Sequence, residues 1–395
     1  MLINKIKHLA EEYFHEVVGM RRQIHANPEL SFQEFKTAAL VSDFLARNEI
    51  PHQKGVAKTG VVGLIHGKNP EKKIIALRAD MDALPISEKN KIPFRSKNPG
   101  VMHACGHDVH TASLLGAAKI LHEIRDYFEG TVKLIFQPSE EEYPGGAKVM
   151  IEEGVLENPA PSSIFGQHVF PELEAGKVGM RPGKFMASTD EIYITVRGRG
   201  GHGAIPHQNI DPVLIGSHIV IALQQIVSRN SNPAMPTVLS IGRFIAEGHT
   251  NIIPDEVHLA GIIRTFNEEW RREIKQKLTT IARGVARSMG GSCHVRIDQG
   301  YPFLVNDDLL TRKAMDHAAE FLGEQNVVEL DMRTTAEDFA YFSQKIPGCF
   351  YRLGIRNLEK GITSSLHSST FDVDEESLRT GMGLMAWLTI RELKS

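Results

Sequence analysis

The sequence predicts an α/β protein in which a layered domain, built from two separate stretches of chain, is interrupted by a smaller ferredoxin-like α+β domain. Three observations support this fold class. Apolar runs typical of buried strands alternate with helical patterns through the first half of the 395 residues. Between 185 and 298 the order becomes strand, helix, strand, strand, helix, strand, which is the ferredoxin-like order. Beyond 299 helix and strand alternate again, so the expected domains are 1–184 with 299–395, and 185–298.

Helix signals define the N-terminal elements. Apolar residues at helical spacing predict one amphipathic helix, which ends at Asn27-Pro28 because the residue before a proline avoids the α region. Ser31 is a candidate N-cap with Glu34 three residues later, and a second helix is expected from there to about Arg47. Strands are then expected at 61–66, 73–79, 131–137 and 162–169, and helices at 108–124 and 145–153.

The interrupting domain follows from a change of pattern. Residues 190–198 alternate between apolar and polar as a half-buried strand does. Further strands are expected at 237–244, 256–266 and 292–297, and helices at 212–229 and 268–289. In the last stretch, helices are expected at 307–322 and 374–393, with a strand at 348–353.

Composition excludes several classes of protein. There are 45 Lys+Arg against 48 Asp+Glu, and the resulting net charge of −3 predicts no nucleic-acid partner. The three cysteines, Cys105, Cys293 and Cys349, cannot form a disulfide framework and predict a reducing compartment. The first residues, MLINKIKHLAEEYFHEVV, lack the apolar core of a signal peptide. No stretch approaches the ~20 apolar residues of a membrane helix, so we expect a cytoplasmic protein without a membrane partner.

The densest chemical cluster is HACGHDVH, residues 103–110. Cys105 and His107 are separated only by Gly106, whose freedom permits a tight turn before the predicted helix. A thiolate and an imidazole this close can bind one metal ion or a pair. An ordinary polar loop with a free cysteine is the alternative, and the scarcity of cysteine in the chain weakens it.

Adjacent carboxylates follow the strand at 131–137 in the segment QPSEEE, residues 137–142. Neighbouring carboxylates raise one another's pKa unless a positive charge lies nearby. A metal ion resolves this repulsion, because one carboxylate ligates while the next accepts a proton. A solvated acidic loop explains the segment equally well, and three glutamates in a row leave their individual roles open.

Two single histidines complete a possible set of metal ligands. His168 lies at the end of the strand expected at 162–169, and His367 lies in a loop. Each alone is more typical of a structural residue. One cysteine, three histidines and one glutamate nevertheless suffice for a two-metal site.

Asp80 and Asp82 end the strand at 73–79 and lie two residues apart on one face. They suit a supporting shell that orients ligating imidazoles, and His110 belongs with them in this shell. An ordinary turn at the end of a strand is the alternative for the two aspartates.

A glycine-rich turn at 198–207 lacks the lysine of a phosphate loop and the spacing of a dinucleotide loop. Glycines on both sides leave His202 exposed at its tip, although a flexible hairpin accounts for the same pattern. Asn251 and Arg264 lie near the ends of expected strands and are individually uninformative.

With these motifs in their order, the chain resembles the metal-dependent N-acyl-amino-acid amidohydrolases, which include the aminoacylases, the hippurate hydrolases and the plant auxin-conjugate hydrolases. The resemblance covers nearly the whole chain. It rests on RADMDALP (78–85), MHACGHDVH (102–110), QPSEE (137–141), FGQHV (165–169), GGHGAIP (200–206), NIIPD (251–255), AEDFAYF (336–342) and LHSSTFDVDEESL (366–378).

The resemblance implies a catalytic domain with a dinuclear metal site and a smaller lid or dimerisation domain. It implies that Cys105 bridges two divalent ions, that His107 and His168 complete one, and that Glu141 and His367 complete the other. The soft sulfur favours zinc, nickel, cobalt or manganese over magnesium.

The remaining roles are also implied by the resemblance. Glu140, the first acid after Gln137-Pro138, would be the general base, although the third acid Glu142 lengthens this loop. His202 would reach a neighbouring subunit's site in a homodimer and polarise the scissile carbonyl, and the substrate carboxylate would be bound by Asn251 and Arg264.

The expected activity is hydrolysis of the amide bond of an N-acyl amino acid, a small-molecule substrate. The alternatives are a dipeptidase, tripeptidase or carboxypeptidase on the same scaffold, and a catalytically inactive relative that binds a ligand or a metal.

Overall fold

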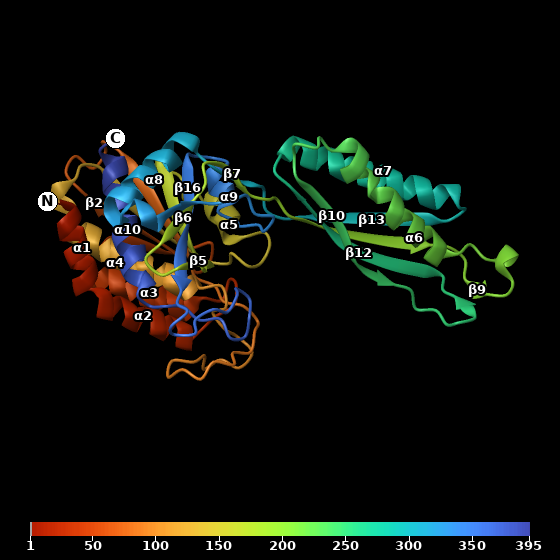
Figure 1. Ribbon diagram of the computed structural model, residues 1–395, viewed down its shortest axis with the longest axis horizontal. Coiled ribbons are helices and arrows are strands. Elements are labelled where there is room, and N and C mark those ends of the chain that lie inside the picture. The colour runs from red at the N-terminus through yellow and green to blue at the C-terminus, as the bar shows by residue number, and fades with distance from the viewer. Residues whose placement is uncertain (1) are drawn as a thin grey trace. The chain divides into compact units, whose positions relative to one another are not determined.

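The computed structural model describes residues 2–395, and the chain divides into two compact units (Figure 1). The first unit comprises the chain up to Phe185, Val305–Met332 and Asp338–Ser395. The second unit comprises Met186–Leu304 and also the short segment Arg333–Glu337.

A mixed sheet of eight strands, in the order β1-β2-β4-β3-β5-β16-β6-β15, forms the centre of the first unit. Neighbours among β4, β3, β5 and β16 are parallel, whereas β2 is antiparallel to β4 and β6 to β16. The strands are β1 His52–Val56, β2 Gly60–His66, β3 Ile74–Asp80, β4 Thr131–Gln137, β5 Ser163–Glu174, β6 Val178–Met180, β15 Val327–Glu329 and β16 Gly348–Arg356. The short strands β7 (Gly183–Met186) and β14 (Leu304–Asn306) pair separately.

Helices cover both faces of this sheet, as the sequence predicts for an α/β fold. Figure 1 shows α4 and α10 on one side of the strands and α5 and α9 on the other. Leu77 and Leu134 of the strands pack with Leu114 and Met382 of the helices in one buried core. The helices are α1 Leu2–Glu12, α2 Phe14–Ala26, α3 Phe35–Arg47, α4 His107–Glu123, α5 Gly146–Glu152, α8 Asp308–Leu322, α9 Ala340–Ser343 and α10 Ser377–Leu393, with short turns η1 Arg125–Tyr127 and η4 Glu324–Asn326.

The parallel strands bring their carboxyl ends to one edge of the sheet. β3 ends at Asp80 and β4 at Gln137, which are paired residues. β5 continues to Glu174, so the expectation that His168 ends a strand is wrong. The pairing of β5 with β3 stops at Gly166, however, and His168 lies two residues beyond it. Continuing that register places His168 level with Asp80, the last residue of β3.

Two expectations for the N-terminal region are corrected by the structure. The predicted single helix is two helices, α1 and α2, because the ψ of −3° at Tyr13 departs from the helical value of about −42°. Ser31 does not cap α3, since its hydroxyl donates to Asp82 at 2.7 Å. The Glu29 carboxylate instead accepts the N–H groups of Lys36 at 2.9 Å and Thr37 at 2.9 Å.

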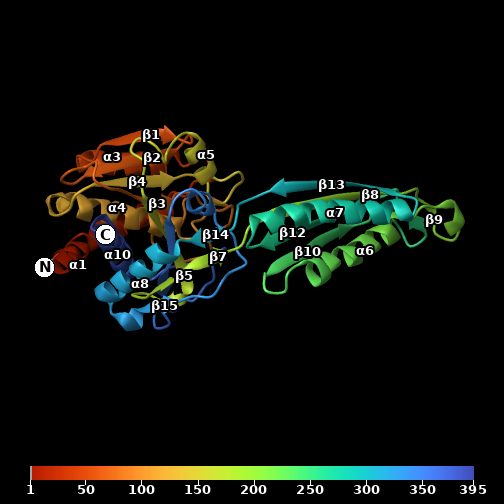
Figure 2. The same ribbon diagram turned by 90° about the horizontal axis from the view of Figure 1, so that it is seen from above.

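The second unit has the predicted β-α-β-β-α-β order (Figure 2). Its sheet has the antiparallel order β10-β12-β8-β13. Ile194 and Leu259 of the sheet pack against Ile219 and Ile274 of its two helices. The elements are β8 Asp190–Arg197, β9 Gly201–His202, η2 Pro206–Gln208, α6 Pro212–Leu223, η3 Ile226–Asn230, β10 Thr237–Ile245, β11 Ile252–Ile253, β12 Glu256–Thr265, α7 Glu268–Ser288 and β13 Ser292–Gln299.

Within the part of the chain that the structure describes, one helical segment, Pro212–Asn230, is long and apolar enough to cross a membrane when judged by length and composition alone. The expectation that no stretch approaches this composition is therefore wrong. A third of the segment is buried within the protein. Ile215, Ile219 and Leu223 face the core of the second unit, which accounts for part of its apolar character.

Candidate metal centre

The turn that enters α4 presents a thiol and an imidazole side by side. Gly106 has a φ of +80°, the left-handed region in which side chains are strained. A Cβ atom at this position would lie 2.5 Å from Cγ2 of Val169 on β5. Glycine is therefore required between Cys105 and His107, which is the first residue of α4.

The fold brings together the five residues that the sequence singled out as ligands. Cys105, His107 and His168 form a first donor set, in which the ligand atoms lie within 4.8 Å of one another. Cys105, Glu141 and His367 form a second donor set that meets the same limit. Cys105 belongs to both sets, which is the arrangement that a bridging ligand requires.

The distances within these sets leave a small space between the donor atoms. Sγ of Cys105 lies 3.4 Å from Nε2 of His168, and Nε2 of His367 lies 3.3 Å from Oε1 of Glu141. Nε2 of His107 lies 3.9 Å from the same glutamate oxygen. His107 is fully buried, whereas the side chain of His367 is 54% exposed, so the second donor set opens toward solvent.

Hydrogen bonds fix which nitrogen each imidazole presents to this space. Nδ1 of His168 donates to the carbonyl of Val169 at 2.7 Å, which leaves Nε2 unprotonated in the neutral ring. Nδ1 of His107 lies 3.2 Å from Oδ1 of Asp82, and its Nε2 faces Glu141. A carboxylate that orients a ligating imidazole in this way is typical of metal sites.

Asp80 and His110 form a supporting pair beneath the donor sets. Nδ1 of His110 lies 2.5 Å from Oδ1 of Asp80, and its Nε2 accepts the N–H of Val169 at 2.8 Å. Both ring nitrogens of His110 are thus engaged. Arg78 donates to Oδ2 of Asp80 at 2.7 Å, and together with His107 and His110 it holds the pKa of this buried carboxyl well below its usual value, against the effect of burial.

Unpartnered atoms and displaced pKa values indicate that the residues fit metal ions. Nε2 of His107 and Oε1 of Glu141 are buried and have no hydrogen-bond partner among the described residues. Burial, followed by the carboxylates of Glu141, Glu140 and Asp80, raises the pKa of the Cys105 thiol well above its usual value. Burial lowers the pKa of His107, but Asp80, Asp82 and Glu141 outweigh it and raise this pKa to about 10. Divalent cations would satisfy the orphaned atoms and stabilise the thiolate.

Two buried residues that support the candidate base were not predicted. Asp338 donates its N–H to Oε1 of Glu140 at 3.4 Å, and Arg78 donates to Oδ1 of Asp338 at 2.7 Å. The amide of Gln137 donates to the same aspartate at 2.8 Å. The motif AEDFAYF contains Asp338, and an acidic pair directly before an apolar run was the available signal.

The other three candidate residues belong to the second unit. His202 lies on β9, and the carbonyl of Asn251 accepts the N–H of Gly203 at 2.8 Å, so these two segments adjoin. Nδ1 of His202 accepts the N–H of Ala204 at 3.0 Å, which leaves the ring proton on Nε2. Arg264 lies on β12, paired with Val238 of β10.

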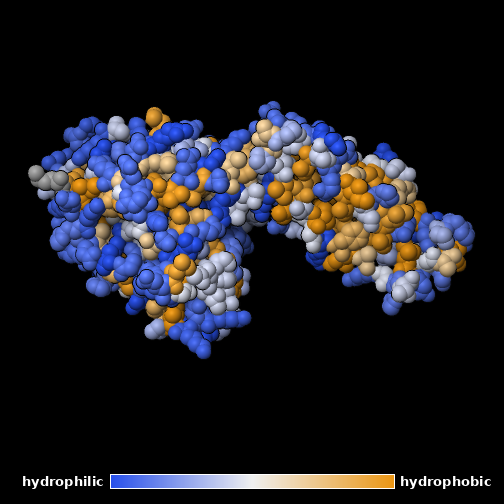
Figure 3. Space-filling view, viewed as in Figure 1, coloured by the Kyte–Doolittle hydropathy of each residue, from blue (hydrophilic) through white to orange (hydrophobic). Residues whose placement is uncertain are grey.

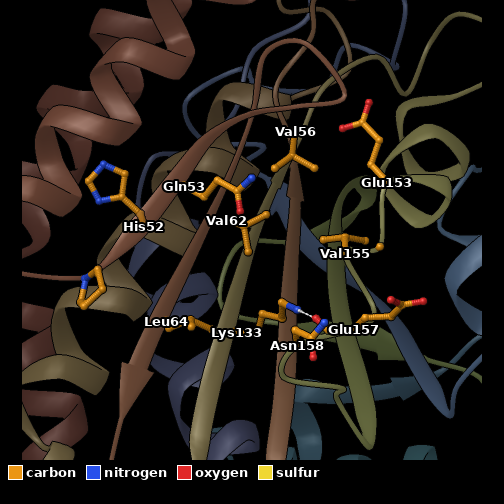
Figure 4. A pocket seen from close by; sticks show the side chains of 12 residues that line it. His52, Gln53, Val56, Val62, Leu64, Lys133, Glu153, Val155, Glu157 and Asn158 are labelled. Carbon is orange, nitrogen blue, oxygen red and sulfur yellow. Dashed lines mark hydrogen bonds between the residues drawn. The ribbon is translucent and has the colours of Figure 1, made fainter.

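A cavity of about 500 Å³ lies over the edge strands of the first unit (Figure 4). Its lining includes Lys133 of β4, whose ammonium donates to the carbonyls of Glu157 at 2.7 Å and Pro159 at 3.1 Å. Burial lowers the pKa of Lys133 to about 8. None of the five candidate ligands lines this cavity, so it is separate from the donor sets.

The chain is similar to known proteins along most of its length. Residues 76–390 match the model of peptidase family M20/M25/M40. The chain is 44% identical over 308 residues to an N-acyl-L-amino acid amidohydrolase of Geobacillus stearothermophilus, covering 78% of this chain and 82% of that protein. It is 40% identical over 393 residues to thermostable carboxypeptidase 2 of Saccharolobus solfataricus, covering 99% and 98%.

A solved structure has a similar fold. The YXEP protein of Bacillus subtilis, a dinuclear metal-binding peptidase of the M20 family, superposes with a TM-score of 0.84 at 35% identity, covering 97% of this chain and 99% of that one. Three observations lead to one family assignment. The family model matches most of the chain, and a relative at 40% identity matches nearly its full length. In addition, two donor sets share one thiol. The chain belongs to peptidase family M20/M25/M40, a family of hydrolytic enzymes that act on amide bonds.

Proposed function

We propose that this enzyme hydrolyses the amide bond of N-acyl amino acids, releasing a carboxylic acid and a free amino acid. The observation that carries the proposal is the sharing of Cys105 by two donor sets, with the carboxylate of Glu140 next to the ligand Glu141. A site that only stored metal would not need a further carboxylate beside its ligands. The relative named N-acyl-L-amino acid amidohydrolase supports this choice of substrate class.

Each residue of the site has a role in this proposal. Cys105, His107 and His168 would hold one divalent ion, and Cys105, Glu141 and His367 the other. Bound there, the ions would supply Lewis acidity that makes water a stronger acid near neutral pH. Zinc, manganese, nickel and cobalt match a donor set of sulfur, imidazole and carboxylate.

Proton transfer belongs to Glu140 in this mechanism. Its carboxylate takes a proton from the attacking water and later gives it to the amine that leaves. The main-chain N–H of Asp338, 3.4 Å from Oε1, orients the carboxylate. Glu140 is 6% exposed, and this burial excludes competing water from the transfer.

The second unit is proposed as a lid and dimerisation domain that also acts on the substrate. The proton on Nε2 of His202 suits donation to the oxygen of the scissile carbonyl, where negative charge develops. Asn251 and Arg264 are the proposed partners of the substrate carboxylate, because an amide and a guanidinium both donate to carboxylate oxygens.

A substrate panel tests this function. After reconstitution with each candidate metal in turn, the enzyme should hydrolyse N-acetyl amino acids and hippurate faster than unblocked dipeptides. The amino acid released is measured by chromatography, and the Glu140→Gln variant prepared in parallel serves as the blank. Turnover of dipeptides without turnover of N-acyl amino acids would instead assign a peptidase. The relative named thermostable carboxypeptidase 2 is the reason for including dipeptides in the panel.

Apolar surface on the second unit supports a homodimer as the working assembly. Leu214 is 50% exposed and Ile221 is 69% exposed on α6, and Figure 3 shows hydrophobic residues gathered around this helix. The edge strand β10, with Phe244 at 40% exposure, carries backbone groups that no strand among residues 2–395 pairs on one side. A two-fold contact through α6 and β10 would cover both features.

A mixing experiment tests whether His202 acts across such a dimer. His202→Ala and Glu140→Gln chains should each be inactive, and their 1:1 mixture should recover about a quarter of wild-type activity, since half the dimers then hold one complete site. Subunit exchange is verified by mass spectrometry of differently labelled chains. Exchange without recovered activity would assign His202 to the site of its own chain.

A reducing location is also part of the proposal. All three cysteines, Cys105, Cys293 and Cys349, are free thiols. Because the proposed bridging thiolate is sensitive to oxidation, we propose that the enzyme works in the cytoplasm.

A further inference from the structure

The turn that follows β4 holds the candidate base in an unusual backbone conformation. Ser139 has a φ of +50°, a value that residues with a Cβ atom seldom adopt. The N–H of Gly146 donates to the carbonyl of Ser139 at 2.6 Å and closes the turn. A Cβ atom on Gly146 would lie 1.7 Å from the carbonyl oxygen of Pro138, so the closure requires glycine. We call residues 138–146 the Ser139 turn.

Two buried carboxylates hold three successive N–H groups of this turn. The N–H of Ser139 donates to Oε1 of Glu34 at 2.8 Å. The N–H groups of Glu140 and Glu141 donate to the two oxygens of Asp82, each at 2.9 Å. Successive N–H groups that point to one side make a cradle for negative charge, and here the charges come from the protein itself.

Glu34 connects the Ser139 turn to two other segments. Its Oε1 also accepts the N–H of Phe32 at 2.9 Å, and its Oε2 accepts the hydroxyl of Thr59 at 2.5 Å. Glu34 and Ser139 are 0% exposed and Thr59 is 2% exposed, so water cannot replace any of these bonds. Burial raises the pKa of Glu34 to about 7, because the charged form of the carboxyl group is poorly solvated there.

The carboxylate of Glu29 serves as a comparison, because it is not hydrogen-bonded to the Ser139 turn. Glu29 lies five residues earlier and accepts N–H groups of Lys36 and Thr37 at 2.9 to 3.0 Å. Both donors belong to the first turn of α3. Its carboxylate therefore stabilises a helix start, and it has no hydrogen bond to the Ser139 turn.

We propose that Glu34 is a positioning residue for the hydrolysis proposed above: its carboxylate clamps the N–H of Ser139 and thereby fixes the direction in which the turn presents Glu140. The inference rests on the proposed function. Asp82 holds the N–H groups of both Glu140 and Glu141, whereas Glu34 holds that of Ser139. Because Ser139 directly precedes Glu140 and is one residue further from Glu141, loss of the clamp should disturb the base more than the proposed ligand.

Hydrogen exchange measured by mass spectrometry tests the clamp without any assay of activity. In metal-free Glu34→Ala, the amide of Ser139, followed in a peptide that begins upstream of Pro138, should exchange at least about tenfold faster than in the wild type, because it has lost its buried acceptor. Glu34→Gln should exchange like the wild type, since its amide oxygen still accepts from Ser139 and its NH₂ group donates to Thr59. Exchange in Glu34→Ala that equals the wild type overturns the proposal.

Kinetics of the metal-loaded enzyme test the consequence. Glu34→Ala should lower kcat at least about tenfold and change KM by less than about threefold, since a displaced base affects only the transition state. Metal content should remain that of the wild type, and Glu34→Gln should restore kcat. Glu29→Ala should lower the thermal midpoint while kcat and exchange in the turn stay unchanged. An equal loss of kcat in Glu29→Ala would overturn the proposal, because the effect would then be general destabilisation.

A double variant shows whether Glu34 acts through Glu140. Added to Glu140→Gln, the Glu34→Ala change should cost no further activity, because the group it positions is already lost. A full additional loss would overturn the proposal. If Glu34→Ala does not fold, Glu34→Asp replaces it, since the shorter side chain keeps the charge but lacks the reach. If the wild type hydrolyses no N-acyl amino acid, the proposed function fails, while hydrogen exchange still decides whether the clamp exists.

Discussion

Replacing Glu140 by glutamine should lower kcat by roughly 10²–10⁴ while both metal ions remain bound. Glutamine has the shape of glutamate but takes no proton from water at neutral pH. Glu140 is paired through Oε1 with the N–H of Asp338 at 3.4 Å, a bond that the amide oxygen of glutamine can retain. The variant should therefore fold normally and lose only the proton transfer. Steady-state kinetics and elemental analysis of the same preparation measure the two quantities.

The chain supplies a control for this experiment in the same acidic run. Glu142 lies two residues further on and is exposed. Glu142→Gln removes the same charge from the same loop and should leave kcat within about threefold of the wild type. Comparing these two variants also shows which of the three successive glutamates is the general base, a question that the sequence alone leaves open. Wild-type activity in Glu140→Gln, or a large loss in Glu142→Gln, would move the base role away from Glu140.

The central strands, and the proximity of Cys105 to His107 in the candidate metal centre, could be predicted from the sequence because local signals there agree with the tertiary structure. The strand expected at 131–137 is β4 with the same bounds, since an apolar run of that length is buried on both faces. Cys105 and His107 adjoin in the sequence, so no long-range contact had to be foreseen. His168 and His367 entered the set because their residue types complete a possible two-metal site, and the family resemblance supplied their assignment to individual ions, since each histidine alone carries no signal of where it lies.

Residues that act through buried charge were harder to predict. Ser31 and Glu34 have the spacing of a capping box, yet their side chains bond to Asp82 and Ser139, 51 and 105 residues further along the chain. Contacts with distant residues therefore prevented the capping box from forming, and the carboxylate of Glu29 caps α3 instead. The ion pair of Arg78 with Asp338 spans 260 residues and leaves no trace in local spacing.

Replacing Cys105 by alanine should remove at least one of the two metal ions, since this thiol belongs to both donor sets. Cys105→Asp should retain two ions, because the two oxygens of one carboxylate can each bind a cation. Cys349→Ala is the matched control: this thiol is 0% exposed on β16 and belongs to neither set. Elemental analysis of dialysed protein measures the stoichiometry, and two ions retained in Cys105→Ala would refute the bridge.

Proton release gives an independent measure of the same bridge. The pKa of the Cys105 thiol is raised by burial and by the carboxylates of Glu141, Glu140 and Asp80, so the metal-free protein holds this proton at neutral pH. Metal binding must expel it, and affinity should therefore rise with pH. His107, whose pKa is raised to about 10, loses a proton in either protein when an ion binds to it, so proton release is compared per ion bound. Zinc titration in weak buffer should thus release about one proton fewer from Cys105→Ala than from the wild type, and equal release would mean that the sulfur binds no metal.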